Sequence, residues 1–156
     1  MSMFNIKTSK FIFGVVSLIV AAFPTLALSS ELETPASIAG VTTITAEKAK
    51  TMVEGGVMIV DARVANEYVE QHIKGAVSIP YKEKSAKSVN FNAKLDSFDL
   101  SKLPADKDTQ VIFYCNAGEC WKSYKASVTA EKAGYKNVYW LRGGIPEWKA
   151  KGFAVE

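Results

Sequence analysis

Two cysteines, Cys115 and Cys120, are the residues of this sequence with the clearest capacity for chemistry. Cys115 closes the apolar run QVIFYC, which is typical of a buried strand, and a helical stretch follows a few residues later. A loop between a strand and a helix directs backbone N–H groups into its hollow, and the helix N-terminus adds partial positive charge. Both effects favour a thiolate over a thiol, so we predict that Cys115 is a nucleophile that needs no histidine base.

The residues after Cys115 are expected to form the substrate-binding loop and to lead into a helix at Ser123. They are Asn116, Ala117, Gly118, Glu119, Cys120, Trp121, Lys122 and Ser123. Backbone amides around such a loop can hold a persulfide, thiosulfate, sulfite or another oxyanion. Trp121 is predicted either as a wall for the substrate or as a side chain folded onto the core, and both interpretations stay open.

Cys120 has three roles open to it. It can form a structural disulfide with Cys115, act as a reversible, resolving thiol, or remain an independent thiol. A bridge over so short a loop would stabilise the fold little. The sequence holds one histidine and two cysteines, whereas a closed zinc site needs four ligands, so a structural metal is not expected.

Short apolar runs and helical stretches alternate along the chain. Strands are predicted at 57–60, 76–80, 110–115 and 137–141, and helices at 45–53, 65–73, 123–133 and 145–151. The polar stretch 81–104 is expected to be irregular, with one short helix near 91–95. This alternation predicts an α/β fold with a central parallel sheet of about five strands and helices on both faces.

Three polar segments follow predicted strands: Asp61 to Arg63, the loop that starts at Cys115, and Arg142 to Gly144. Ligands in such folds bind beyond the carboxyl ends of the strands, so these segments are expected to converge on one side of the sheet. We expect Asp61 and Arg63 to brace the site. Glu67 is interpreted as a helix-surface residue or a partner of Arg63.

The N-terminus has the order of a secretory signal peptide. Lys7 and Lys10 precede an uncharged apolar run at 11–23, and Pro24 and small residues follow. We predict a signal peptide at 1–29, a linker at 30–40 and one folded domain at 41–156, with an uncleaved anchor as the alternative. The protein is thus expected to be exported, and periplasmic in a Gram-negative source. The net charge of +3 is too weak to favour nucleic acid, and membrane contact is expected only through the signal peptide.

Two segments resemble the rhodanese family. The residues from Asp61 to Pro80, DARVANEYVEQHIKGAVSIP, are similar to the pattern D-x-R-x3-E-F/Y-x2-G-H-I-x-G-A-x2-I/L-P, with Gln71 in place of the first glycine. The residues from Gly134 to Trp148, GYKNVYWLRGGIPEW, are similar to the closing motif G-F/Y-x2-V-x2-L-x-G-G-x3-W. The resemblance covers about residues 40–156 and implies a rhodanese-like fold. The motif implies that His72 is a buried hydrogen-bonding residue, with a catalytic base as the alternative.

The resemblance implies sulfurtransferase chemistry without a cofactor. Cys115 would take sulfane sulfur from thiosulfate or a persulfide donor, and the resulting persulfide would pass it to a thiol, of a small molecule or a protein, or to cyanide. Two alternatives remain: a thiol–disulfide redox protein that uses Cys115 and Cys120, and a non-catalytic module that carries sulfur or binds a partner.

The loop departs from the family pattern C-x4-R/K-S/T. Counted from Cys115, the basic position holds Cys120, whereas counted back from Ser123 it holds Lys122 and the loop is two residues longer. We prefer the second count, because the following helix then matches the family in length. A phosphatase loop, C-x5-R, is not expected, since Trp121 stands at the arginine position.

Overall fold

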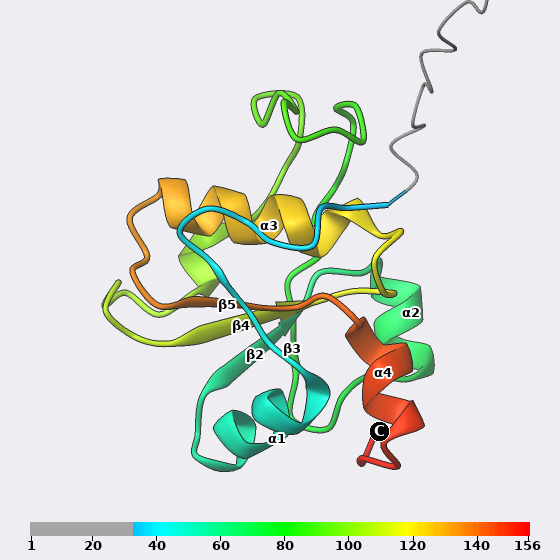
Figure 1. Cartoon of the computed structure of the whole chain (residues 1–156). Coiled ribbons are helices and arrows are strands. Elements are labelled where there is room, and N and C mark those ends of the chain that lie inside the picture. The colour runs from blue at the N-terminus through cyan, green and yellow to red at the C-terminus, as the bar shows by residue number, and fades with distance from the viewer. Residues whose placement is uncertain (1–32) are drawn as a thin grey trace, which may run out of the picture.

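One five-stranded parallel sheet forms the centre of the molecule (Figure 1). The computed structural model describes residues 33–156, so the predicted signal peptide and the start of the linker lie outside the described residues. The strands run in the order β1-β5-β4-β2-β3. Their bounds are β1 Thr42–Thr43, β2 Met58–Asp61, β3 Val77–Ser78, β4 Val111–Tyr114 and β5 Val138–Leu141. The predicted sheet is confirmed. The sequence missed β1, because two exposed threonines carry no apolar pattern.

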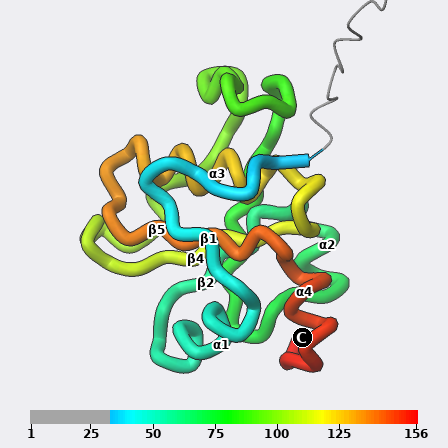
Figure 2. Tube along the Cα trace, viewed as in Figure 1, coloured from blue at the N-terminus to red at the C-terminus, as the bar shows by residue number. Residues whose placement is uncertain are grey.

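Helices cover both faces of the sheet, as predicted. Their bounds are α1 Ala46–Glu54, α2 Ala65–Glu70, α3 Trp121–Lys132 and α4 Gly144–Ala150. The long helix α3 lies on one face, and α1 and α4 lie on the other (Figure 1). Figure 2 shows the segment before β1 running alongside α3, where Ile38 packs against Trp121 and Trp140. Within residues 33–156, every helix is too short or too polar to cross a membrane.

The central strand β4 shows why polar and apolar residues do not alternate in the predicted strands. Val111 and Phe113 pack in the cluster that includes Ala126 of α3. Ile112 and Tyr114 point the other way, into the cluster formed with α1 and α4. All four side chains are buried, because a parallel sheet covered on both sides leaves neither face in water.

Two predicted helices were wrong in their extent. The helix predicted over 65–73 ends at Glu70, and Gln71 is already extended. Residues 71–73 leave the helix because Ile73 is buried below it and its N–H donates to the hydroxyl of Tyr114. The short helix expected near 91–95 is only a turn, and the one helical segment within 81–104 is a 3-10 helix at Leu100–Lys102.

A buried lysine joins the irregular segment 81–104 to α3. Lys125 of α3 is 0% exposed, and its Nζ lies 2.9 Å from Glu83 Oε2 and 2.9 Å from Ser85 Oγ. It also lies 3.7 Å from Asp96 Oδ2. We call Lys125, Glu83, Ser85 and Asp96 the Lys125 network. The Asp96 carboxylate in turn accepts hydrogen bonds from Ser85 and from the Tyr81 hydroxyl. These polar contacts hold the segment in place together with apolar side chains such as Phe98 and Leu103, which pack in the core cluster with Phe113.

Candidate functional site

Cys115 follows β4 directly, at the carboxyl edge of the sheet between β2 and β5. It is 1% exposed. Its carbonyl accepts a hydrogen bond of 3.0 Å from the N–H of Ile145, at the start of α4. Gly144 makes this approach possible, because it has φ +59° and a Cβ there would lie 2.1 Å from the Cys115 oxygen. The closing motif of the sequence thus secures the backbone of the predicted nucleophile.

The loop after Cys115 is shorter than preferred from the sequence. The helix α3 begins at Trp121, two residues before Ser123, and leaves residues 116–120 as the loop. The predicted helix start at Ser123 was therefore wrong, and the shorter loop fits the count that places Cys120 at the usual basic position. Ala117 has φ 63°, and the N–H of Cys120 donates to its carbonyl at 3.1 Å. This tight turn closes the loop in five residues.

Cys115 and Cys120 are joined by a disulfide, with their Cα atoms 6.1 Å apart. The bonded pair fits two of the three roles open to Cys120, a structural disulfide and a reversible one, and does not fit an independent thiol. Cys120 is the N-cap residue of α3, which runs for 12 residues. The positive end of the helix thus lies at the sulfur pair, where it favours thiolate after reduction.

A segment before the sheet ties down the outer side of the loop. The carbonyl of Gly118 accepts hydrogen bonds from the N–H of Thr34 at 2.7 Å and from its hydroxyl at 2.8 Å. Arg142 donates from Nη2 to the Thr34 carbonyl at 2.7 Å and from Nε to the Pro35 carbonyl at 3.0 Å. A Cβ at position 118 would lie 2.8 Å from Nη2, so glycine lets the guanidinium lie against the loop. The predicted convergence of Arg142 on the cysteine loop is confirmed, but sequence reasoning missed Thr34.

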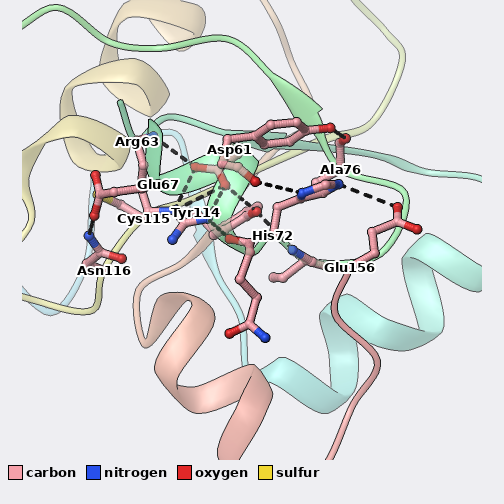
Figure 3. A network of polar contacts seen from close by, with 12 residues as sticks. Asp61, Arg63, Glu67, His72, Ala76, Tyr114, Cys115, Asn116 and Glu156 are labelled. Carbon is pink, nitrogen blue, oxygen red and sulfur yellow. Dashed lines mark hydrogen bonds and ion pairs between the residues drawn. The ribbon is translucent and has the colours of Figure 1, made fainter. Parts of the chain in front are cut away.

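Asp61 and Arg63 form a buried pair at the end of β2 (Figure 3). Arg63 donates from Nη2 to Asp61 Oδ2 at 2.6 Å and from Nε to Asp61 Oδ1 at 3.0 Å. The Tyr114 hydroxyl donates to Asp61 Oδ2 at 2.5 Å. We call Asp61, Arg63 and Tyr114 the Asp61 network. It adjoins the cysteine directly, because Tyr114 precedes Cys115 in the chain. Tyr114 was missed, since a tyrosine within an apolar strand gives no sign of a polar contact.

Burial and charge set the ionisation of this network. Burial, followed by the adjacent Asp61 carboxylate, raises the pKa of Tyr114 above its usual value. Desolvation lowers the pKa of Arg63, but the hydrogen bonds and charge of Asp61 outweigh it and leave the pKa raised. Tyr114 is therefore a neutral donor and Arg63 a permanent cation in the physiological pH range.

A polar cavity of about 390 Å³ lies beside the loop. Its lining residues are Arg63, Glu67, Glu70, Gln71, Asn116, Ile145, Pro146 and Lys149. Asn116 donates through its amide to Glu67 Oε1, so Glu67 contacts the cysteine loop (Figure 3). The predicted pairing of Glu67 with Arg63 is replaced by this contact, while Arg63 donates to the Gln71 carbonyl at 2.7 Å. Two cations, Arg63 and Lys149, and two anions, Glu67 and Glu70, thus border a hollow that reaches Asn116, the residue after Cys115.

Three residues predicted in the substrate-binding loop belong instead to α3. Trp121 is 1% exposed and packs against Tyr124 with ring centroids 5.0 Å apart, so it is a core side chain. The Ser123 hydroxyl is also buried and accepts a hydrogen bond of 3.0 Å from Trp140 Nε1. Lys122 borders a different hollow, beside Pro80 and Tyr81. Of the residues predicted in the substrate-binding loop, the structure therefore places 116–120 in the loop and 121–123 in α3.

His72 has contacts typical of a structural residue. Its Nδ1 lies 2.8 Å from the Tyr68 carbonyl, and its ring stacks on that of Tyr68 with centroids 3.7 Å apart. Its Nε2 lies 3.5 Å from the Glu156 carboxylate (Figure 3). Across residues 33–156, no group of three or more His, Cys, Asp or Glu side chains is placed to hold a metal ion.

The comparison with protein families agrees with this fold. The model of the family described as "Rhodanese-like domain" matches residues 45–151. The chain therefore belongs to the rhodanese-like family, which includes sulfurtransferases. Family membership supports sulfur transfer in broad terms.

Individual relatives are distant. The mitochondrial protein HIGH ARSENIC CONTENT 1 of Arabidopsis thaliana is 29% identical over 120 residues, which cover 77% of this chain and 69% of that protein. The tRNA uridine(34) hydroxylase of Sodalis glossinidius is 34% identical over 91 residues, which cover 58% of this chain and 23% of that enzyme. The chain thus spans about a quarter of the hydroxylase.

Solved structures share the fold. The rhodanese-like domain of an Anabaena protein is 27% identical, with a TM-score of 0.53 over 73% of this chain and 77% of that one. A thiosulfate sulfurtransferase from Pseudomonas aeruginosa is 26% identical, with a TM-score of 0.56, and the match covers 74% of this chain and 20% of that enzyme.

Proposed function

We propose that the protein is an exported sulfurtransferase that moves sulfane sulfur from thiosulfate or a persulfide donor, through a Cys115 persulfide, to a thiol or cyanide acceptor. The observation that carries the proposal is the placement of Cys115 between the central strand β4 and the start of α3. There a short loop supplies backbone amides and the helix supplies positive charge, and both favour a thiolate and an anionic sulfur adduct.

The chemistry starts from the reduced cysteine pair. The Cys115 thiolate attacks the outer sulfur of thiosulfate, the sulfur–sulfur bond of the donor breaks, and its electron pair leaves with sulfite. Arg63 and Lys149 border the cavity beside Asn116 together with Glu67 and Glu70, so the attraction for an anionic donor is assigned to the loop amides and the N-terminus of α3. An acceptor thiolate then takes the outer sulfur and restores the Cys115 thiolate. The reaction needs no metal or cofactor, because the thiol itself carries the sulfur.

Export is the second part of the proposal. The basic, apolar and small residues in order at 1–29 support a signal peptide, followed by a linker and a domain from residue 41. A cysteine pair that forms a disulfide suits an oxidising compartment, which is the periplasm in a Gram-negative source. The partners proposed are a small sulfur donor and a small or protein thiol, with no role for nucleic acid.

A thiol–disulfide redox protein is the second candidate, and the disulfide between Cys115 and Cys120 favours it. Such a protein would exchange its disulfide with the thiols of a substrate protein and would accept no sulfur atom. The two candidates therefore differ in whether the protein takes a sulfur atom from a donor and gains its mass.

The test follows sulfur on reduced, desalted protein kept free of oxygen. On addition of thiosulfate, the wild type should release sulfite, whereas Cys115→Ser should release none and gain no mass, because the change removes the nucleophile at nearly constant shape. Circular dichroism and thermal unfolding of both reduced proteins serve as the control for folding. Equal sulfite release by Cys115→Ser would place the chemistry on Cys120. Failure of the wild type to release sulfite or to accept sulfur from inorganic polysulfide would favour the redox candidate.

A further inference from the structure

The bonded cysteine pair points to an activity beyond transfer to an external acceptor. We propose, on the basis of the proposed function, that Cys120 discharges the Cys115 persulfide as sulfide. The protein would then be a sulfide-releasing enzyme that depends on a dithiol reductant. In this reaction Cys120 is a catalytic residue, because its sulfur bonds to the reacting atom.

The loop holds the two sulfurs within bonding reach. The disulfide is formed within a loop of five residues whose turn is fixed by the bond from the Cys120 N–H to the Ala117 carbonyl. On the outer side, Thr34 binds the Gly118 carbonyl through two hydrogen bonds. At the other end, Ile145 binds the Cys115 carbonyl. With the backbone tied at three points, Cys120 needs no rearrangement of the loop to reach Cys115.

Access to the site favours the internal thiol over an external one. Cys115 is 1% exposed, and the Thr34 segment covers the adjoining loop. The donor and an external acceptor must each enter this position in turn, whereas Cys120 is already beside the sulfur and reacts in an intramolecular step. Cys120 is also the N-cap residue of α3, where the positive helix end favours its thiolate.

The step balances without an external oxidant. The Cys120 thiolate attacks Cys115 Sγ, and the bond from Cys115 Sγ to the outer sulfur breaks. The electron pair of that bond leaves with the outer sulfur, which is protonated to hydrogen sulfide. The outer sulfur is reduced, and the two cysteine sulfurs are oxidised to the disulfide that the structure contains.

The next cycle needs two electrons from a dithiol, such as an exported protein with a pair of neighbouring cysteines. Its thiolate attacks Cys120, which is partly exposed, and the buried Cys115 leaves as the thiolate favoured by the loop amides. The second thiol of the reductant then releases Cys120. Over a full cycle, thiosulfate and a dithiol become sulfite, hydrogen sulfide and a disulfide.

The experiment is a single turnover with reduced, desalted wild type and Cys120→Ser. Each protein is given one equivalent of thiosulfate, or in a second arm inorganic polysulfide followed by desalting, with no thiol present. Sulfite, sulfide and intact mass are then measured. Wild type should release about one sulfide per chain and end as the disulfide, whereas Cys120→Ser should keep the extra sulfur on Cys115 and release sulfide only after dithiothreitol is added. Reduced wild type is the matched control for folding, because it also lacks the disulfide.

The outcomes separate this inference from the proposed function. If wild type holds a stable persulfide and releases sulfide no faster than Cys120→Ser, the discharge by Cys120 is wrong and the sulfurtransferase proposal stands. If neither protein accepts sulfur from either donor, the sulfurtransferase proposal fails and the discharge fails with it.

Discussion

The Asp61 network and the Lys125 network both bury charge, but they lie on different sides of the sheet and fix different parts of the chain. Tyr114 of the first packs in the cluster formed with α1 and α4, whereas Lys125 belongs to α3 on the other side. Asp61 and Arg63 stand two residues apart, and Arg63 lines the polar cavity beside the cysteine loop. Lys125 gathers partners about 30 and 40 positions earlier in the chain.

The need to pair a buried charge thus has a different consequence in each network. A buried charge persists only when it is paired and hydrogen-bonded, so each network fixes the backbone that supplies its partners. In the Asp61 network the fixed element is Arg63, which borders the candidate site. In the Lys125 network it is the irregular segment 81–104, which has no helix of its own beyond one 3-10 turn. The first network should therefore affect activity and stability, and the second stability alone.

The largest effect is expected from Asp61→Asn. The substitution leaves the Arg63 cation buried without its counter-charge, and breaking a buried pair in this way costs roughly 3–5 kcal/mol in the free energy of unfolding. Sulfite release from thiosulfate should fall as well, because Arg63 loses its fixed position at the cavity. Urea unfolding and single-turnover sulfite release measure the two effects.

Asp108→Asn is the matched control for that variant. Asp108 forms an exposed ion pair of 2.8 Å with Lys136, which should contribute little to stability because water screens it. If both aspartate variants lose the same stability, burial does not distinguish the two pairs. If Asp61→Asn keeps full sulfite release, the Asp61 network has no part in the site.

A somewhat smaller loss is expected from Lys125→Met. The change removes the cation but leaves Asp96 its hydrogen bonds from Ser85 and Tyr81, so the cost should be near the lower end for a broken buried pair, about 3 kcal/mol. Sulfite release per folded molecule should not change. Lys132→Met, an exposed position on the same helix, is the control and should shift stability by no more than about 0.5 kcal/mol. A loss of sulfite release in Lys125→Met would break the proposed division between the networks.

The smallest expected effect is a dependence of stability on pH that comes from Asp96 of the Lys125 network. Burial opposes the ionisation of Asp96, but hydrogen bonds from Ser85, Lys84 and Tyr81 outweigh it and lower the pKa of Asp96 to about 2. A lowered folded-state pKa contributes stability that is present above the unfolded value of 3.8 and is lost as pH falls toward 2. The free energy of unfolding of the wild type should therefore drop by up to about 2 kcal/mol across that window.

Asp96→Asn should lack this part of the acid dependence while starting from a lower stability at neutral pH. Urea unfolding of both proteins between pH 2 and 6 measures it. Parallel pH profiles for the two proteins would show that Asp96 does not supply the acid-sensitive contribution.

Much of the scaffold could be predicted from local patterns. Runs such as VIFY predict strands buried on both faces, and Thr45 predicts the start of α1, where its hydroxyl accepts a bond from the Lys48 N–H at 3.4 Å. The boundaries were less accurate, because α2 and α3 begin or end where tertiary contacts decide. Trp121 enters the helix because its ring packs into the core, and this contact shortened the loop relative to the preferred count.

The sequence by itself determined the parallel sheet, the position of Cys115 at a strand end, and the family to which the chain belongs. These depend on local periodicity and on motifs that are continuous in the chain. Only the tertiary structure decided that Cys120 is bonded to Cys115, that Thr34 and Arg142 cover the loop, and that Lys125 is buried among carboxylates. The physical reason is that such contacts join residues far apart in the chain or depend on loop conformation, so neither hydrophobic pattern nor spacing encodes them.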